Sequence, residues 1–192
     1  MAEADPISIY LRAEERARKH GVDTAPVALG TADASGRPSV RIVLIRHVDE
    51  RGFVFHTNYN SRKAEELKQN ARAALCFHWP TLEEQIRVEG LTEYISEAES
   101  DEYFAGRPRG SQIGAWASDQ SRELVSQEAL YTRTRDVERR FEGRAVPRPP
   151  HWGGIRVIPE RMEFWYGRAD RLHERLLYVK TGGRWQASRL FP

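Results

Sequence analysis

Cysteine is almost missing from this chain of 192 residues, which holds only Cys76. A single thiol excludes an intrachain disulfide and is typical of a reducing compartment, so we expect a cytoplasmic protein. Long apolar runs are missing too, because none approaches the roughly 20 residues that span a bilayer. The acidic start Met1–Asp5 lacks the basic-then-apolar pattern of a secretion signal, and we expect no membrane contact.

Charge of one sign is not in excess. The chain has 30 Lys and Arg against 28 Asp and Glu, which gives a formal net charge of +2 at pH 7. The basic residues are dispersed along the sequence, whereas nucleic-acid-binding domains gather them on one face. We therefore expect no nucleic-acid partner, and the cations matter through their positions.

Several common ligand-binding motifs are absent. The sequence contains no Gly-x-Gly-x-x-Gly, no phosphate loop ending in Gly-Lys-Ser/Thr, no His-Glu-x-x-His and no Cys-x-x-Cys. His78, His151 and His173 lack the spacing of metal ligands. A Rossmann-type cofactor site and a metal site are therefore not expected.

The hydrophobic pattern predicts a mostly β (α+β) protein, an antiparallel barrel with peripheral helices. Short β-branched segments separated by Gly-bearing turns are typical of antiparallel strands, and regular strand–helix alternation is lacking. Strands are expected at about 25–32, 39–47, 53–57, 73–79, 85–95, 154–165 and 171–189, the last with a hairpin turn at 180–183. Helices are expected at about 7–20, after a cap at 60 or 61, from a capping box at 96–99 to 104, and at 122–141, with 107–121 irregular.

Two cations stand at the start of one expected helix, in the run Ser61-Arg62-Lys63. The helix dipole favours anions at this end, so cations are misplaced there unless an anion binds. Free N–H groups together with Arg62 and Lys63 would form a phosphate cradle. The alternative is that both side chains simply point to water.

Polar residues on two strands are further candidates. Arg41 and Arg46 are five residues apart, so a regular strand directs them to opposite faces, toward two ligands or toward one ligand and an interface. The alternative for Arg46 is a strand-end side chain that reaches solvent. Gln85 shares a face with Arg87 and is placed either to hydrogen-bond a heteroaromatic edge or to face water.

The segments that connect the expected strands and helices carry a third group of candidate binding residues. Gln120-Ser121 precedes an expected helix and is suited to donate to a phosphate or to cap that helix. Tyr103, Arg107 and Ser111 run from a helix end into a long loop, which can clamp a second phosphate or be an ordinary solvated connection.

The C-terminal region combines an indole, an imidazole and guanidiniums. Glu163-Phe164-Trp165 is followed closely by the run 171–175, Arg-Leu-His-Glu-Arg. If that run is extended, Arg171, His173 and Arg175 project from one face. Guanidiniums that flank an imidazole suit a phosphorylated or otherwise anionic aromatic ligand, although arginine-rich strands are often solvated faces.

Taken together, these motifs resemble the pyridoxamine 5′-phosphate oxidase family, FMN-dependent enzymes of vitamin B6 metabolism. The resemblance runs from about Val27 to Pro192 and is carried by the order of segments 41–45, 57–58, 61–63, 85, 103–104, 107–116, 120–121, 152–154 and 163–175. It implies one FMN-binding split-barrel domain over residues 1–192. It also implies a homodimer, with FMN held by both chains in clefts at the subunit interface.

The resemblance also implies roles for individual residues. FMN would be bound by Arg41, Ile42, Val43, Leu44, His56, Thr57, Arg62, Lys63, Gln85, Gln120, Ser121, Trp165 and Arg175. The B6 phosphate substrate would be bound by Arg46, Tyr103, Arg107, Ser111, Arg171, Leu172 and His173, with Arg171 and His173 as the catalytic pair. Arg46 and His56 depart from the family's usual Lys and Tyr, and the family's N-terminal Arg-Arg-x-Tyr segment is lacking.

The implied reaction is oxidation of pyridoxamine or pyridoxine 5′-phosphate to pyridoxal 5′-phosphate, with O₂ as electron acceptor and H₂O₂ as product. Two alternatives stay open. One is a related flavin-dependent oxidase that acts on another aromatic substrate, such as a phenazine-pathway intermediate. The other is a non-catalytic protein that binds flavin or pyridoxal phosphate.

Overall fold

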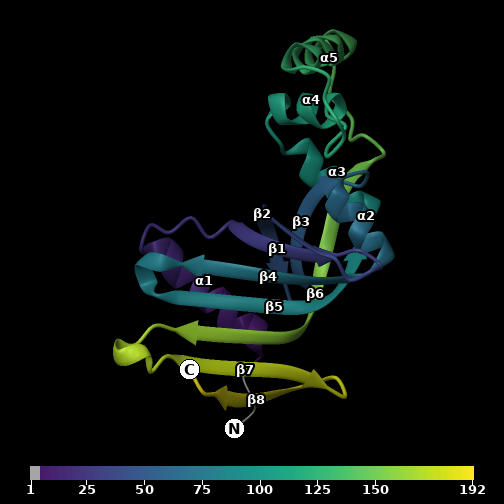
Figure 1. Ribbon diagram of the computed structural model, residues 1–192. Coiled ribbons are helices and arrows are strands. Elements are labelled where there is room, and N and C mark those ends of the chain that lie inside the picture. Colours follow the sequence, from purple (N-terminus) through teal and green to yellow (C-terminus); the bar gives the residue numbers. More distant parts are fainter. Residues whose placement is uncertain (1–4) are drawn as a thin grey trace.

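The computed structural model describes residues 5–192 and contains an antiparallel sheet of eight strands in the order β3-β2-β1-β4-β5-β6-β7-β8. A further pairing of β3 with β6 closes the first six strands of this order into a barrel, and β7 and β8 continue the sheet beyond it (Figure 1). The strands are β1 Pro26–Ala32, β2 Pro38–Asp49, β3 Gly52–Asn58, β4 Arg72–Trp79, β5 Glu84–Tyr94, β6 Trp152–Tyr166, β7 Glu174–Thr181 and β8 Arg184–Leu190. The prediction of a mostly β, antiparallel split barrel with peripheral helices is confirmed.

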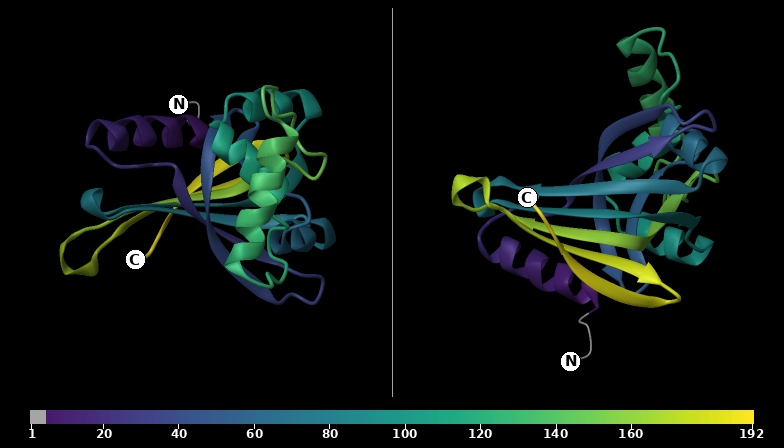
Figure 2. Two further views of the ribbon diagram at one scale, coloured as in Figure 1. Left: turned by 90° about the horizontal axis from the view of Figure 1, so that it is seen from above. Right: turned by 60° about the horizontal axis from the view of Figure 1, so that its bottom comes forward.

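Five α-helices surround the barrel: α1 Pro6–Lys19, α2 Arg62–Gln69, α3 Glu97–Ala105, α4 Arg109–Ala117 and α5 Gln127–Arg140. Helices α3, α4 and α5 gather at one end of the barrel, while α1 lies along the sheet on the other side of the molecule (Figures 1 and 2). None of the helices within residues 5–192 is long and apolar enough to cross a membrane.

Strand β6 links the barrel to its extension. Its first part, 152–157, pairs with β3, and its last part, 161–166, pairs with β7, while β5 runs beside most of its length. The register between β5 and β6 shifts at Gly90, where a Cβ atom would lie 1.9 Å from the carbonyl oxygen of Ile158. Only glycine permits this close approach, which lets the strand pair bend where the barrel opens.

Aromatic side chains fill the barrel, and α1 covers them. The Tyr10 ring lies 4.8 Å from the Phe53 ring and 5.0 Å from the Phe77 ring, centroid to centroid. All three residues are fully buried, as α1 turns the apolar stripe of Ile7 and Tyr10 inward. Leu11, the next residue after Tyr10, is 39% exposed, because it lies on the edge of the helix facing solvent.

A second, smaller core holds the helical end together. Phe104 on α3, Ile113 on α4, Phe141 after α5 and Trp152 at the start of β6 are all buried in it. Helix α3 opens with the predicted capping box, in which Ser96 and Glu99 exchange hydrogen bonds. This core fixes α3 and α4 beside β3 and β6, where the site residues of the next section lie.

Two sequence predictions about this helical region were wrong. Residues 109–117, expected to be irregular, form α4, because Ile113 is buried in the second core despite two helix-weakening glycines. The last helix begins at Gln127 and not at 122, with Ser126 as its N-cap. Gln120 and Ser121 therefore do not cap a helix.

Candidate functional site

A cleft of about 670 Å³ lies between β2, β3, the start of α2 and the α3–α4 connection. It brings together residues that are far apart in the sequence. Those that the sequence predicted to bind a ligand and that line this cleft are Ile42, Val43, Leu44, Arg46, His56, Thr57, Lys63, Tyr103, Arg107, Ser111 and Gln120. Arg46 lies on the outward face of β2 with Ile42 and Leu44, whereas Arg41 lies on the inward face. The two arginines are therefore on opposite faces of the strand, as their five-residue spacing predicted.

Lys63 is the buried cation of the cleft. Its side chain turns back over the start of α2 and its Nζ donates to Gln120 Oε1 at 2.9 Å, Thr57 Oγ1 at 3.0 Å and Ser61 Oγ at 3.1 Å. Burial, with the neighbouring Arg41 charge, lowers the pKa of Lys63 to about 8. The alternative in which both helix-start cations point to water is thus wrong for Lys63.

Arg41 and Arg62 lie beside Lys63 and share one carboxylate, Glu66. Arg62 Nε donates to Glu66 Oε1 at 2.8 Å, and Arg41 Nη2 donates to Glu66 Oε2 at 3.2 Å. Glu66 is itself buried. Three cations thus converge at the N-terminus of α2, an arrangement that attracts a phosphate group.

A stack of flat side chains forms another wall of the cleft. The His56 ring lies parallel to Tyr103 at 3.7 Å and to Trp152 at 5.4 Å, centroid to centroid. Within residues 5–192 neither nitrogen of the buried His56 ring has a hydrogen-bond partner. Burial, aided by the charge of Arg107, lowers the pKa of His56 to about 4, so the ring is neutral at pH 7.

Arg107 extends the same stack. Its guanidinium carbon lies 4.5 Å from the centroid of the Trp152 ring. Its Nη1 is buried and finds no partner in the described part of the chain, and burial lowers the pKa of the group. An unpaired guanidinium beside Ser111, in the first turn of α4, forms a second place suited to an anion.

The remaining predicted residues lie elsewhere. Gln85, Trp165 and Arg175 are direct neighbours across β5, β6 and β7. Trp165 is twelve residues beyond Gly153, the partner of Thr57 in the β3–β6 ladder. At roughly 3.3 Å per residue, the two ends of β6 are up to about 40 Å apart along the strand. The predicted site residues of one chain therefore form two separate groups, which we call the cleft half and the tail half.

In the tail half, Arg175 is held by Glu163. Its Nε and Nη2 donate to the two Glu163 carboxylate oxygens at 2.9 and 3.1 Å, and its Nη1 donates to the carbonyl oxygen of Phe191 at 3.0 Å. Glu163 also accepts from Arg87 at 2.5 Å. Burial alone would raise the pKa of Glu163, but Arg175 and Arg87 lower it.

The prediction that 171–175 is extended was wrong. Ala169–Arg171 is a 3₁₀ turn, Asp170 and Arg171 have φ of +55° and +60°, and β7 begins only at Glu174. Arg171 and His173 therefore do not share a strand face with Arg175. Left-handed backbone at two non-glycine residues costs on the order of 1 kcal/mol each, and such strain is concentrated at functional sites.

His173 lies against the tail-half tryptophan. Its ring centroid is 4.6 Å from that of Trp165, and its Nδ1 accepts the backbone N–H of Arg168 at 3.2 Å. A neutral His173 must then carry its proton on Nε2, which is left to donate to a ligand. Leu172, between the two predicted catalytic residues, is 69% exposed.

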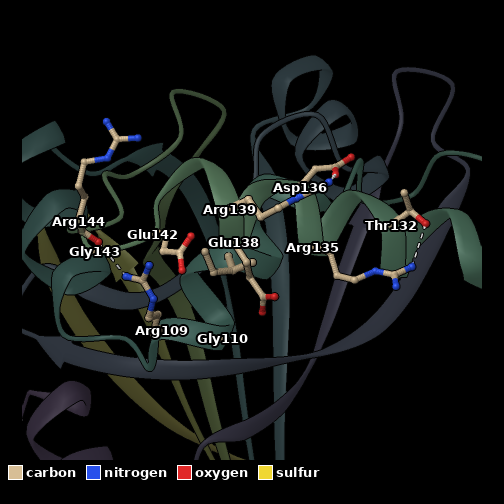
Figure 3. A pocket seen from close by; sticks show the side chains of 11 residues that line it. Arg109, Gly110, Thr132, Arg135, Asp136, Glu138, Arg139, Glu142, Gly143 and Arg144 are labelled. Carbon is tan, nitrogen blue, oxygen red and sulfur yellow. Dashed lines mark hydrogen bonds and ion pairs between the residues drawn. The ribbon is translucent and has the colours of Figure 1, made fainter.

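A larger hollow of about 1010 Å³ lies between α4 and α5 (Figure 3). Its arginines already have partners: Arg139 pairs with Asp136, and Arg109 donates to the backbone carbonyls of Phe141 and Arg144. None of the predicted site residues lines it. This hollow is therefore no rival to the cleft.

Sequence reasoning missed two residues of the cleft half. Trp152 was noted only as part of a Trp-Gly-Gly segment, yet its ring stacks on His56 and lies against the Arg107 guanidinium. Glu66 follows Arg62 by four residues, the spacing of a helical ion pair, and that spacing was a usable signal. Ser121 does not line the cleft, and its φ of +72° directs the chain away from α5.

The fold and site define a class of protein: a split barrel whose polar clefts are suited to a phosphorylated aromatic ligand. The pyridoxamine 5′-phosphate oxidase family model matches residues 15–141, and the model of the pyridoxine 5′-phosphate oxidase C-terminal dimerisation region matches residues 152–192. The chain belongs to the pyridoxamine 5′-phosphate oxidase family of FMN-dependent oxidoreductases.

Relatives over the whole chain support this membership. The chain is 55% identical over 192 residues to the pyridoxine/pyridoxamine 5′-phosphate oxidase of Rubrobacter xylanophilus, with coverage of 100% of this chain and 88% of that protein. It is 52% identical to the enzyme of the same name from Anaeromyxobacter dehalogenans, with coverage of 100% and 97%.

Solved structures show the same fold. PhzG from Burkholderia lata, in complex with tetrahydrophenazine-1-carboxylic acid, superposes with a TM-score of 0.94 at 35% identity over 98% of this chain and 93% of that chain. An FMN-binding protein from Nostoc punctiforme superposes with a TM-score of 0.78 at 19% identity over the full length of both chains.

Replacing His56 with Phe is expected to stabilise the protein, since Phe keeps the stack and removes two unpaired buried nitrogens. The gain at pH 7 should be on the order of 1 kcal/mol. In the wild type, the unfolded chain takes up a proton below pH 6.5 while folded His56 stays neutral down to about pH 4. The wild type should therefore lose up to about 3 kcal/mol between these pH values, a loss that His56→Phe avoids.

Urea unfolding of both proteins at pH 7, 6 and 5 measures this difference. The advantage of His56→Phe should widen as the pH falls. A constant difference between the two proteins at all three pH values would show that His56 is not kept neutral by its burial.

Proposed function

We propose that this protein oxidises pyridoxamine or pyridoxine 5′-phosphate to pyridoxal 5′-phosphate with FMN as cofactor and O₂ as electron acceptor. The alcohol would give the aldehyde and H₂O₂, and the amine, with water, would give the aldehyde, ammonia and H₂O₂. The observation that carries the proposal is the pair of anion-binding places in one cleft, at the start of α2 and at the Arg107–Ser111 segment. A phosphorylated cofactor and a phosphorylated substrate would need both.

The first place fits the phosphate of FMN. Arg41, Arg62 and Lys63 converge there at the N-terminus of α2, with Thr57 and Gln120 as further polar partners. A buried ammonium such as Lys63 is costly unless it meets a counter-charge, and an FMN phosphate supplies one. In this proposal the strand segment 42–44 and His56 flank the bound cofactor.

The second place fits the phosphate of the substrate. The unpaired, buried Nη1 of Arg107 lacks the partner that a phosphate oxygen would provide. Ser111 and the first N–H groups of α4 add neutral donors. Tyr103 presents a flat ring, and Arg46 brings a further cation to the same cleft.

We infer a homodimer that combines the cleft half of one chain with the tail half of its partner. Trp165 lies too far along β6 to meet the cleft of its own chain. Its cross-strand neighbours Gln85 on β5 and Arg175 on β7 are equally distant from that cleft. The outer face of β2 supports an interface, because Val40 is 71% exposed and Ile42 is 64% exposed. Exposed apolar side chains in a row are typical of surfaces that associate.

Bound FMN supplies the two-electron oxidation and the delivery of those electrons to O₂. The residues of the chain bind FMN and the substrate, orient them and polarise them. Arg171 projects from a strained turn and would orient the substrate, and His173 would hold its proton at Nε2 and donate it in a hydrogen bond to the substrate. Leu172 would line the pocket. Holding the reactants in a productive orientation can contribute roughly 7–11 kcal/mol.

A second candidate is an oxidase for a non-phosphorylated aromatic acid. The close superposition with PhzG in its complex with tetrahydrophenazine-1-carboxylic acid favours it. Arg46 and His56, where the family usually has Lys and Tyr, are compatible with a changed pocket. The unpaired Arg107 beside Ser111 favours a phosphorylated substrate instead.

Anaerobic addition of each compound to the purified flavoprotein separates the possibilities. A B6 oxidase should lose its yellow colour with pyridoxine or pyridoxamine 5′-phosphate and release H₂O₂ when air is admitted. Bleaching by tetrahydrophenazine-1-carboxylic acid alone would favour the second candidate. A protein that stays yellow with every compound would be a binder and not an oxidase.

Replacing Arg171 with Ala is expected to reduce kcat/KM by about a hundredfold, because the substrate loses its orienting contact. The flavin content should remain that of the wild type, since Arg171 is not among the proposed FMN ligands. Absorbance at the flavin maximum and peroxide release report the two quantities. Loss of flavin with unchanged turnover per bound flavin would contradict this role.

Subunit mixing tests the composite site. Arg107→Ala damages the cleft half and Arg171→Ala damages the tail half, so each homodimer should be nearly inactive. A mixed dimer keeps one intact pair of halves, and random reassociation should restore about a quarter of the wild-type activity. Mixing that restores nothing, with mixed dimers verified by mass, would mean that each site is built from one chain.

A further inference from the structure

Glu66 is a buried carboxylate on which two of the proposed phosphate-binding arginines converge. Its side chain is 6% exposed, and four side chains donate to it. Arg62 bonds Oε1 at 2.8 Å, while Thr31, Ser39 and Arg41 bond Oε2 at 2.5, 2.6 and 3.2 Å. Burial alone would raise the pKa of Glu66, but these donors lower it to about 2, so the group is an anion at pH 7.

The contacts leave Arg41 little freedom. Its Nη1 donates to Thr31 Oγ1 at 2.5 Å and to the carbonyl oxygen of Leu29 at 3.3 Å, and its Nη2 donates to Ser39 and to Glu66. The guanidinium is thus oriented before any ligand arrives. Ordering a binding side chain in advance lowers the entropic cost of binding.

The bond to Arg62 points to a role beyond folding. The Arg62 side chain is 59% exposed, and an ion pair with such an exposed partner contributes little to stability. What the bond does is restrict a long, flexible side chain at the first turn of α2. That position is beside the buried Lys63, at the proposed FMN phosphate subsite.

The local charge balance agrees with a phosphate ligand. Arg41, Arg62 and Lys63 are cations, and Glu66 offsets one of them, which leaves two positive charges in the cluster. A phosphate monoester carries about −1.5 to −2 at pH 7. Without Glu66 the three cations would repel one another.

We propose that Glu66 is a positioning residue that holds Arg41 and Arg62 in the orientation that binds the phosphate of FMN, an inference that rests on the proposed cofactor site. It does not touch the ligand in this proposal and acts through the two arginines. Its effect should therefore be confined to ligands that carry the phosphate group.

The test compares FMN with riboflavin, which lacks the phosphate. Binding of each to the apoprotein is measured by quenching of flavin fluorescence. Glu66→Gln should weaken FMN binding about tenfold, because charge-assisted contacts that order both arginines are lost. Riboflavin binding should change by less than about twofold, since the ring contacts remain.

Two variants serve as controls. Glu65→Gln removes the same charge from the neighbouring position of α2, where Glu65 pairs with the exposed Arg122, and should leave the ratio of FMN to riboflavin affinity unchanged. Glu66→Asp keeps the buried charge but shortens its reach, which protects the fold if Glu66→Gln is unstable. It should still weaken FMN binding by about threefold or more, because the orientation of the arginines is lost although the charge is kept.

A variant cycle decides whether Glu66 acts through the arginines. In a chain that carries Arg41→Gln and Arg62→Gln, adding Glu66→Gln should alter FMN affinity by less than about twofold. Equal weakening of FMN and riboflavin by Glu66→Gln, or a full additional loss in the arginine-free background, would overturn the inference while the proposed function stands. Wild-type protein that binds neither flavin would overturn the proposed function and this inference together.

Discussion

The hydrogen-bond ladder of β6 is the constraint on which the rest of the structure depends. This strand pairs with β3 at one end and with β7 at the other, so it both closes the barrel and carries the C-terminal hairpin away from it. Its 15 residues set the separation of the cleft half from the tail half. Because β6 closes the barrel at one end, its other end cannot bend back to the cleft of the same chain. This geometry favours a second chain as the source of the tail half that would complete the cleft.

Buried carboxylates organise the cations at both half-sites. Glu66 binds Arg41 and Arg62 in the cleft half, and Glu163 binds Arg87 and Arg175 in the tail half. A guanidinium on a flexible stem is a poor recognition group until something limits its rotamers. The pairing of each carboxylate with two arginines achieves this, and it keeps enough positive charge at the cleft for an anionic ligand. Arg107 differs, because its buried Nη1 has no such partner in the described chain.

Much of the fold was predictable because its signals are local. The β-branched run at Pro38–Asp49, the Gly-bearing turns and the capping box at Ser96 each determine a backbone conformation within a few residues. The same reasoning failed for α4, whose glycine-containing sequence is a weak helix former. That helix exists because Ile113 is buried against residues far along the chain. The start of β7 was missed for a related reason, since the left-handed turn at Asp170 and Arg171 has no glycine to indicate it.

The sequence by itself determined the family, the strand order along the chain and the identity of most cleft residues, because these depend on residue type and spacing. The tertiary structure alone decided that Lys63 is buried among three oxygens, that His56 is stacked and unpaired, and that Glu66 joins two arginines. It also decided that Arg171 and Arg175 do not share a face and that the predicted residues divide into two separate groups. Burial and pairing depend on contacts between distant segments, and those contacts exist only once the barrel has closed.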